Sequence, residues 1–242
     1  MRILVISDIH SNITALEAVL ESAGQVDAVW CLGDLVGYGP DPDECVARVR
    51  ELPNLLCIMG NHDAAVSGLR NIEKFNDEAE QAILVTRSII KPESVEYLKT
   101  LPETIETESS ILAHGSPRNP IWEYVLDTLI ARMSLAFVQK DLVFVGHTHL
   151  PLCFNYDPKS DKMTKKFLRP GEKIRIHNRM ILNPGSVGQP RDHDPRASYG
   201  IYNPEDTTWK LHRVEYDIPA VQKRILAVGM PAKHALRLTE GW

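Results

Sequence analysis

The chain has 242 residues, of which 43% are hydrophobic and 24% are charged. This length and composition suit a globular protein with a substantial core and exclude a disordered, collagenous or coiled-coil chain. The 27 basic and 32 acidic residues give a net charge of −5, which argues against a protein that coats nucleic acid or an anionic membrane.

The first 150 residues alternate short apolar runs with amphipathic segments. This alternation predicts a largely parallel sheet covered by helices. We expect strands at 3–7, 28–32, 55–59, 111–113 and 142–145, and helices at 12–23, 43–50 and 121–138, with two more helices in 76–100 that are divided at Pro92.

After His149 the chain changes to short strand candidates joined by tight turns, a pattern typical of an antiparallel sheet. We expect these strands at 152–156, 165–168, 173–177, 180–182, 198–202 and 209–214, followed by a helix at 220–228 and another after Pro231. No linker or repeat interrupts the chain. We therefore expect one domain over residues 1–242, with two stacked sheets.

No stretch is apolar and long enough to cross a bilayer, and Asp8 interrupts the apolar run at the N-terminus, so no export signal is expected. We expect a cytoplasmic protein without a membrane partner. In that compartment the cysteines are expected to be reduced, and their apolar surroundings predict buried side chains. They are Cys31, Cys45, Cys57 and Cys153.

Polar residues that bind metals follow five of the predicted strands. They are Asp8 and His10, Asp34, Asn61 with His62 and Asp63, His114, and His147 with His149. Because the carboxyl ends of parallel strands lie at one edge of a sheet, we expect these side chains to meet there. Asp-x-His or Gly-Asp alone is a common turn or helix-cap pattern, but five of the nine histidines fall at these strand ends.

Imidazoles mixed with carboxylates suit Mn, Fe, Zn, Ni or Co better than Ca or Mg. Seven or eight donors are too many for one tetrahedral ion and suit two ions that share a carboxylate. Two-metal sites of this kind catalyse in-line displacement at phosphorus. The sequence therefore predicts two divalent transition-metal ions and a phosphorylated small-molecule substrate.

The motifs, in this order and spacing, resemble the calcineurin-like metallophosphoesterase family, in particular its small bacterial and archaeal members. The resemblance rests on Asp8-x-His10, Gly33-Asp34, Gly60-Asn61-His62-Asp63, His114-Gly115 and Gly146-His147-Thr148-His149, with a similar segment at 183–191. It implies an α/β fold, a four-layer α-β-β-α sandwich of two mixed sheets flanked by helices.

The resemblance also implies a role for each motif residue. Asp8, His10 and His149 would bind one ion, Asn61, His114 and His147 would bind the other, and Asp34 would bridge them. His62 would be a catalytic imidazole at the leaving-group oxygen, with a structural histidine as the alternative. Asp63 either orients that imidazole or caps the loop.

The implied reaction is hydrolysis of a phosphodiester, such as a small nucleotide-type diester or a dinucleoside polyphosphate, by in-line attack of hydroxide formed at the two ions. Protein phosphatases of the wider family continue Gly-Asp with an Asp-Arg-Gly motif, whereas Gly33-Asp34 continues here as Leu-Val-Gly-Tyr-Gly-Pro. Substrate contacts must then come from elsewhere, and Tyr38, Arg118 and Arg191 are candidates.

Alternative functions are a phosphomonoesterase or protein phosphatase of the same family, and a metal-bound interaction module without turnover. Retention of His62 favours an enzyme over the module. The basic segment 159–175 has few interleaved aromatics, so an exposed hairpin is expected rather than stable nucleic-acid binding. His193 has no assigned role, and a homo-oligomer remains open.

Overall fold

The computed structural model describes all 242 residues, and its layers follow from strands that bury both faces. In β1 (Ile3–Ile6), Ile3 and Val5 enter one hydrophobic cluster, whereas Leu4 and Ile6 enter another. Successive side chains of a strand point to opposite faces, so β1 packs against a second sheet on one side and against helices on the other.

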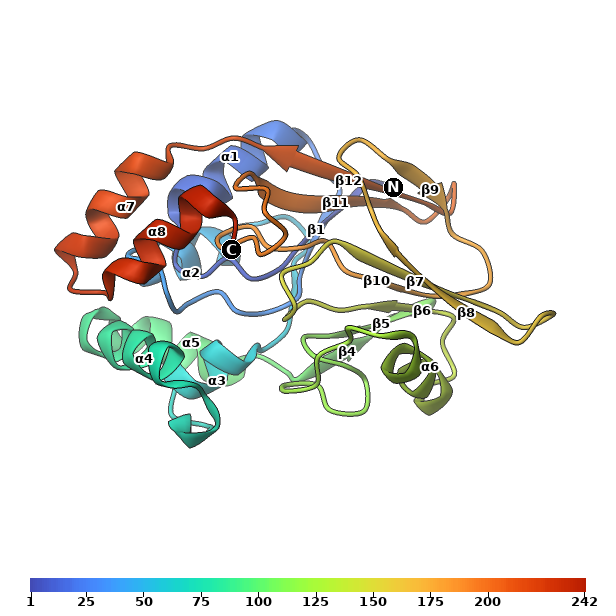
Figure 1. The fold of residues 1–242 in the computed structure, drawn as a ribbon, viewed down its shortest axis with the longest axis horizontal. Coiled ribbons are helices and arrows are strands. Elements are labelled where there is room, and N and C mark those ends of the chain that lie inside the picture. The colour runs from blue at the N-terminus through green and yellow to red at the C-terminus, as the bar shows by residue number, and fades with distance from the viewer.

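The twelve strands form two six-stranded mixed sheets (Figure 1). The first sheet has the order β3-β2-β1-β11-β12-β9, built from β1, β2 (Ala28–Cys31), β3 (Leu56–Cys57), β9 (Lys173–Arg175), β11 (Ala197–Asn203) and β12 (Thr208–Val214). The second has the order β4-β5-β6-β10-β7-β8, built from β4 (Thr104–Glu106), β5 (Ser110–Ala113), β6 (Leu142–Phe144), β7 (Leu152–Asp157), β8 (Lys162–Phe167) and β10 (Arg179–Leu182).

Helices cover the outer faces of both sheets and one end of the sandwich (Figure 1). They are α1 (Ile13–Ala23), α2 (Pro42–Arg50), α3 (Asn61–Val66), α4 (Asp77–Ile89), α5 (Pro92–Thr100), α6 (Thr128–Phe137), α7 (Ile218–Ala227) and α8 (Ala232–Glu240), with a 3₁₀ turn at Ile72–Lys74. The four-layer arrangement of helices, sheet, sheet and helices agrees with the predicted fold class. No helix is both long enough and apolar enough to cross a membrane.

The sheets do not divide the chain into a parallel first half and an antiparallel second half, and that expectation is wrong. In the first sheet β1 pairs in parallel with β2 but antiparallel with β11. In the second sheet β10 pairs in parallel with β6 and antiparallel with β7. Apolar patterning indicates where a strand lies but not which distant strand pairs with it, so each sheet recruits strands from both halves.

The helix predicted at 121–138 begins later than expected, and a short helix was missed. Asp127 caps α6 by accepting a hydrogen bond from the Ile130 amide (2.9 Å), so residues 121–127 remain a loop. Helix α3 starts within the Gly60-Asn61-His62-Asp63 motif, where all its residues are buried and no amphipathic period is visible.

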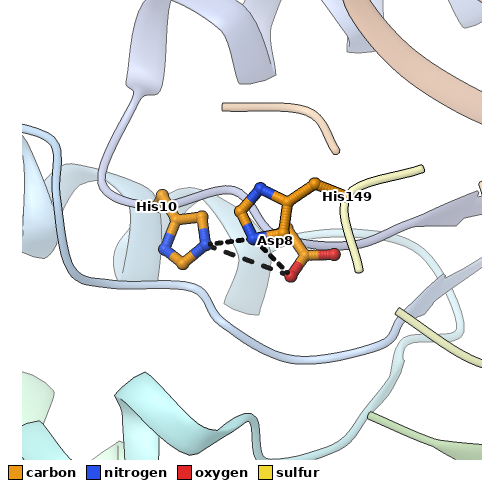
Figure 2. Close-up of side chains that lie close together, drawn as sticks. All are labelled: Asp8, His10 and His149. Carbon is orange, nitrogen blue, oxygen red and sulfur yellow. Dashed lines mark hydrogen bonds and ion pairs between the residues drawn. The ribbon is translucent and has the colours of Figure 1, made fainter. Parts of the chain in front are cut away.

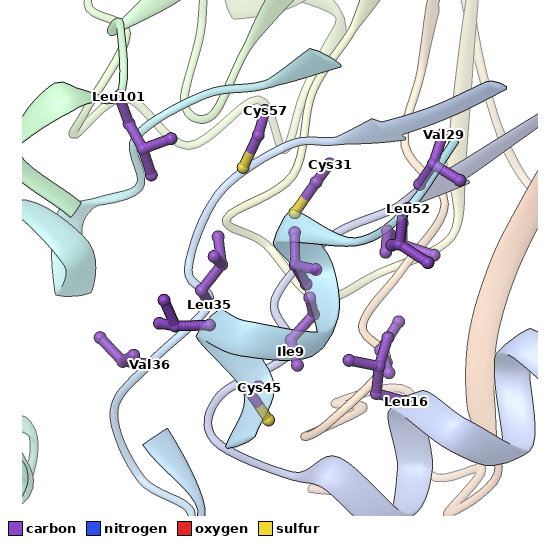
Figure 3. Close-up of a cluster of buried hydrophobic side chains, with 14 of the residues drawn as sticks. Ile9, Leu16, Val29, Cys31, Leu35, Val36, Cys45, Leu52, Cys57 and Leu101 are labelled. Atoms are coloured by element: carbon purple, nitrogen blue, oxygen red, sulfur yellow. The ribbon is translucent and has the colours of Figure 1, made fainter. Parts of the chain in front are cut away.

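A cluster of 28 buried residues joins α1 and α2 to the outer face of the first sheet (Figure 3). Cys31, Cys45 and Cys57 pack within this cluster, and Cys153 is buried between the sheets, as predicted. A smaller cluster packs α7 and α8 against α4 and Tyr38. These three helices thereby lie beside the loop that follows β2.

Candidate metal centre

The loops after β1 and β2 run side by side and contain the first candidate ligands. The Asp8 amide donates to the Gly33 carbonyl (3.0 Å), and the His10 amide donates to the Asp34 carbonyl (3.0 Å). The side chains of Asp8, His10 and Asp34 are at most 1% exposed. Backbone pairing between the two loops thus fixes three buried candidate ligands relative to one another.

Several candidate site residues have a left-handed backbone, with φ between 50° and 64°. They are Asp8, His10, Asp34, Tyr38, His147 and His149. This conformation is unfavourable for residues other than glycine, and such strain clusters at functional sites. The strained backbone therefore sets the directions of these side chains.

Asp8, His10 and His149 form the first group of candidate ligands, and Figure 2 shows their polar atoms turned toward one another. His149 Nε2 lies 3.2 Å from His10 Nε2 and 3.3 Å from Asp8 Oδ1. His10 Nε2 lies 3.9 Å from the same Asp8 oxygen. Two imidazole nitrogens and a carboxylate oxygen are a donor set that suits a divalent transition metal.

The outer nitrogens of these two imidazoles determine their tautomers. His10 Nδ1 lies 3.1 Å from the Val36 carbonyl oxygen, and His149 Nδ1 lies 2.5 Å from the Gln189 carbonyl oxygen. A carbonyl only accepts hydrogen bonds, so both Nδ1 atoms carry the proton and both Nε2 atoms present lone pairs to each other. Facing lone pairs repel unless a cation binds both, so the residues fit a metal ion.

The second group combines Asp34, Asn61, His114 and His147. His114 Nε2 lies 3.0 Å from Asn61 Oδ1, 3.1 Å from His147 Nδ1 and 3.3 Å from Asp34 Oδ2. The other ring nitrogen of His114 lies 2.8 Å from the Leu32 carbonyl oxygen, which accepts its proton and leaves Nε2 facing the other members of the group.

Asp34 lies between the two groups. Its Oδ2 atom is 3.6 Å from His10 Nε2 and 3.3 Å from His114 Nε2. Its Oδ1 atom accepts a hydrogen bond from the His62 amide (2.8 Å). A carboxylate that faces one imidazole of each group is placed to bridge two ions.

The sequence suggested that the candidate ligands share one edge of one sheet. The structure shows that they do not. Asp8, Asp34 and Asn61 follow strands of the first sheet, whereas His114 and His147 follow β5 and β6 of the second. The cluster therefore lies where the ends of the two sheets meet.

The charges within the cluster shift several pKa values. Burial opposes ionisation of Asp34, but the charge of His114 and a hydrogen bond from its imidazole outweigh burial and hold the pKa of Asp34 well below its usual range. Burial likewise opposes protonation of His114, but the Asp34 carboxylate raises the pKa of His114 to about 9. Burial lowers the pKa values of three other imidazoles, those of His10, His147 and His149, which favours the neutral form that binds metals.

His62 lies at the start of α3 beside the cluster, with a nitrogen within 4.8 Å of the donor atoms of His10 and Asp34. Its ring centroid is 4.4 Å from that of Tyr38, and burial lowers its pKa to about 4. Its Nδ1 atom is buried without a hydrogen-bond partner, and a Cβ atom at Gly37 would come within 2.5 Å of it. The loop after β2 can pack directly against this imidazole because residue 37 is a glycine.

Asp63 contacts backbone rather than the His62 ring. Its Oδ2 atom accepts from the amides of Asp34 (2.8 Å) and Gly60 (3.0 Å), and its Oδ1 atom accepts from those of Leu35 (2.9 Å) and Val36 (3.2 Å). Of the two roles considered for Asp63, these contacts favour capping of the loop that contains Asp34.

A cavity of about 600 Å³ borders the metal cluster. Tyr38 and Arg191, two of the predicted substrate contacts, line it. The Arg191 guanidinium lies over the Tyr38 ring, 5.7 Å from its centroid, and Arg191 Nη2 donates to Gln189 Oε1 (2.9 Å). Arg191 thus reaches the cavity without a carboxylate partner.

The third predicted contact, Arg118, does not line the cavity, because its guanidinium forms an ion pair with Glu123 inside its own loop. His193, which had no predicted role, stacks on Trp242 with the ring centroids 5.4 Å apart. The basic segment includes the exposed strand β8, which forms a hairpin with β7, as predicted.

Sequence reasoning missed most of the remaining cavity wall. The missed residues are Lys74, Phe75, Asn76, Ala79, Asn119, Trp122, Tyr124, Arg237 and Trp242. Tyr124 stacks on the candidate ligand His147, with the ring centroids 3.8 Å apart. The loop after His114-Gly115 was a signal that could have identified Trp122 and Tyr124, but Arg237 and Trp242 lie far along the chain from any motif.

Three comparisons show which known proteins this chain resembles. The crystal structure of a metallophosphoesterase from Sphaerobacter thermophilus superimposes with a TM-score of 0.92, at 43% identity over 100% of this chain and 99% of that one. The uncharacterised protein MJ0912 of Methanocaldococcus jannaschii is 39% identical over 95% of this chain and 93% of its own length. The phosphodiesterase YfcE of Escherichia coli is 26% identical over 83% of this chain and 86% of its own.

The family match has a defined extent. Residues 1–207 match the calcineurin-like phosphoesterase superfamily domain, which includes every candidate metal ligand. Helices α7 and α8 follow the matched region. The paired donor groups, the four layers and this match lead to one conclusion: the chain belongs to the calcineurin-like phosphoesterase superfamily.

Proposed function

We propose that the protein is a phosphodiesterase that uses two divalent transition-metal ions. The observation that supports this most strongly is the position of Asp34, whose Oδ2 atom faces His10 in one donor group and His114 in the other. Both sheets supply candidate metal ligands to this cluster. We therefore also propose that residues 1–242 form one domain.

Each donor group would bind one ion, with Asp8, His10 and His149 in the first and Asn61, His114 and His147 in the second. Two bound ions would supply positive charge to the phosphoryl oxygens and lower the pKa of the water nucleophile. The buried carbonyls beside the imidazoles would accept the Nδ1 protons and turn the Nε2 atoms toward the ions. His114, whose pKa is raised to about 9, would give up its Nε2 proton when an ion binds.

His62 and Arg191 would act on the substrate directly. His62 is neutral near pH 7 because burial lowers its pKa, so its imidazole would donate an N–H hydrogen bond to the leaving-group oxygen. The Arg191 guanidinium, which has no carboxylate partner, would bind a phosphoryl oxygen. The Tyr38 ring, packed between His62 and Arg191, would keep both in position.

The size of the cavity supports a small substrate. About 600 Å³ accommodates a molecule of nucleotide size, and aromatic side chains in the wall can pack against a base. The absence of the Asp-Arg-Gly motif after Gly33-Asp34 is a reason to favour small diesters over phosphoproteins.

Hydrolysis of bis-p-nitrophenyl phosphate and p-nitrophenyl phosphate by the Mn²⁺-loaded protein tests the proposal. We expect the diester to react at least as fast as the monoester. His62→Ala should lower kcat on the diester by about 100-fold or more while two metal ions per chain remain bound, as measured by elemental analysis. The control is His177→Ala, which removes an exposed histidine and should leave kcat unchanged.

Each other result has a distinct meaning. Turnover of the monoester alone would replace the proposal with a phosphomonoesterase. Turnover of neither substrate, with two ions bound, would overturn the enzymatic function and favour a metal-bound interaction module. Full activity of His62→Ala would remove His62 from the mechanism.

A further inference from the structure

The cavity wall away from the metal cluster is positively charged. Lys74, Arg191 and Arg237 line the cavity, and Asp34 is the one side-chain carboxylate among the lining residues. The whole chain has a net charge of −5, so this concentration of cations is local. Because Asp34 would be neutralised by bound metal ions, the wall attracts anions.

Lys74 lies at the end of a series of contacts that leads outward from the catalytic histidine. Ring centroids are 5.1 Å apart between His62 and Phe75, and 5.0 Å apart between Phe75 and Trp122. The Lys74 ammonium group lies 5.5 Å from the centroid of the Trp122 ring. Lys74 and Trp122 are therefore linked to His62 through Phe75, and all four residues line the same cavity.

Arg237 approaches the same cavity from α8. Its guanidinium lies 3.1 Å from Glu78 of α4, and Lys233 pairs with the same carboxylate. One carboxylate thus faces two cations, which leaves a net positive charge. Lys233 does not line the cavity, whereas Arg237 does, so the two cations of α8 differ in access to a ligand.

An aromatic surface lies close to these cations. The Trp242 indole lines the cavity, stacks on His193 and is 56% exposed. Both Trp242 and Arg237 follow the region that matches the family domain. This part of the wall is therefore additional to the part of the chain that supplies the metal ligands.

We propose that Lys74 and Arg237, with the indoles of Trp122 and Trp242, form a subsite for a second phosphate and an attached aromatic base. The natural substrate would then have at least one phosphate group beyond the scissile one, as in nucleoside polyphosphates. The inference rests on the proposed function, because it places the scissile phosphate at the metal cluster. Cations bind the second phosphate, and the indoles stack on the base.

Binding of adenosine, AMP and the nonhydrolysable α,β-methylene-ADP to the metal-loaded full chain tests the subsite, measured by calorimetry and tryptophan fluorescence. Fluorescence reports on the cavity because Trp122 and Trp242 line it, whereas Trp30 and Trp209 are buried in the core. We expect the methylene-ADP to bind about tenfold more tightly than AMP, since it adds contacts between opposite charges.

Arg237→Gln and Lys74→Gln should each weaken binding of the methylene-ADP by about tenfold and reduce its advantage over AMP. Lys233→Gln is the matched control, because it also removes a partner of Glu78 from α8 but lies outside the cavity. It should leave the affinities for both nucleotides unchanged.

Three results would overturn the subsite. These are equal affinities for AMP and the methylene-ADP, equal affinities for adenosine and the methylene-ADP, and the same loss of affinity in Lys233→Gln as in Arg237→Gln. Hydrolysis of bis-p-nitrophenyl phosphate separates the two proposals. If the diester is hydrolysed but the nucleotides bind alike, the subsite alone fails; if the nucleotides bind as expected without hydrolysis, the proposed function alone fails.

Discussion

Asp63 connects the Asn61-His62 motif to the loop that contains Asp34, the proposed bridging ligand. Its two carboxylate oxygens accept four buried backbone N–H groups, and three of these belong to the consecutive residues 34–36. One side chain thus holds the loop after β2 to the start of α3. Asp34 is therefore positioned by a neighbour that lies close to the reaction centre but contacts only backbone.

Replacement of Asp63 by Asn should destabilise the protein itself. An amide has only one accepting oxygen, so two or more buried N–H groups lose their partner, at about 1–3 kcal/mol for each buried group. We expect Asp63→Asn to lower the free energy of unfolding of the metal-free protein by about 2 kcal/mol or more, measured by urea denaturation.

The control for this measurement is Asp206→Asn, which changes an exposed turn and should alter stability little. His62→Ala should not reproduce the destabilisation in full, because the His62 side chain makes no hydrogen bond through Nδ1. Loss of activity in Asp63→Asn without a change in stability would instead support an orienting role toward His62.

At the scale of single elements, one arginine makes the side-chain hydrogen bonds between α7 and the N-terminal half of the chain. Arg224 donates to both carboxylate oxygens of Asp41, at 3.0 and 2.9 Å, and to Thr14 Oγ1 at 2.7 Å. The other contacts of α7 and α8 with that half are apolar packing against α4 and Tyr38 and the ion pairs of Lys233 and Arg237 with Glu78.

We predict that Arg224→Ala loosens α7 and α8 more than the rest of the molecule. Arg224 is partly exposed, so solvent screening limits the expected loss to about 1 kcal/mol. Hydrogen exchange measured by mass spectrometry should be faster in 218–240 and unchanged in β1 and β2. Lys223→Ala, an exposed neighbour on the same helix, should have no such effect; uniform acceleration over the whole chain would contradict local attachment.

The helices and strands differ in how much of them could be predicted. Helix α1 was predictable, because Asn12 caps it and Gly24 ends it, and both signals are local in sequence. The start of α6 was not, since the apolar residues Ile121, Trp122 and Val125 imitate a helical face but belong to a loop that lines the cavity and packs on the second sheet. Pairing of β11 with β1 depends on contacts across the chain, which local patterning does not encode.

In the site, too, features that depend on local sequence were predictable, and features that depend on contacts between distant residues were not. The candidate ligands were predictable because each immediately follows an apolar run, and the glycines beside them mark tight turns. Arg118 was proposed because it lies in a loop that follows a strand end, but it is paired with Glu123 five residues later. Arg237 lies on a helix remote from the motifs, so its presence in the cavity follows only from the packing of α8 against α4.

At the scale of the whole molecule, the donor groups join the two sheets. Asp34 follows β2 in the first sheet, and its partner His114 follows β5 in the second. Metal binding should therefore stabilise the contact between the sheets in addition to any local effect. A ligand present at 100 times its Kd contributes about 2.7 kcal/mol of stability, or roughly 5–10 °C in Tm for a chain of this size.

We predict that Mn²⁺ raises Tm by about that amount in differential scanning calorimetry and leaves a single transition. Chelation should reverse the increase, and Asp34→Asn should reduce it strongly because one oxygen of the bridge is replaced by a nitrogen that donates. Two separate transitions, with only one affected by the metal, would contradict the view that the ions join both sheets.

The left-handed backbone at six site residues has a consequence for how the sequence can change. Each such residue costs the fold of order 1 kcal/mol or more relative to glycine, so a substitution that abolishes a ligand can also relieve strain. Selection for thermal stability alone would therefore replace these site residues before it changed the residues that form the two sheets. A descendant freed from catalysis would keep the two sheets, lose its histidines and aspartates first, and become a more stable protein by doing so.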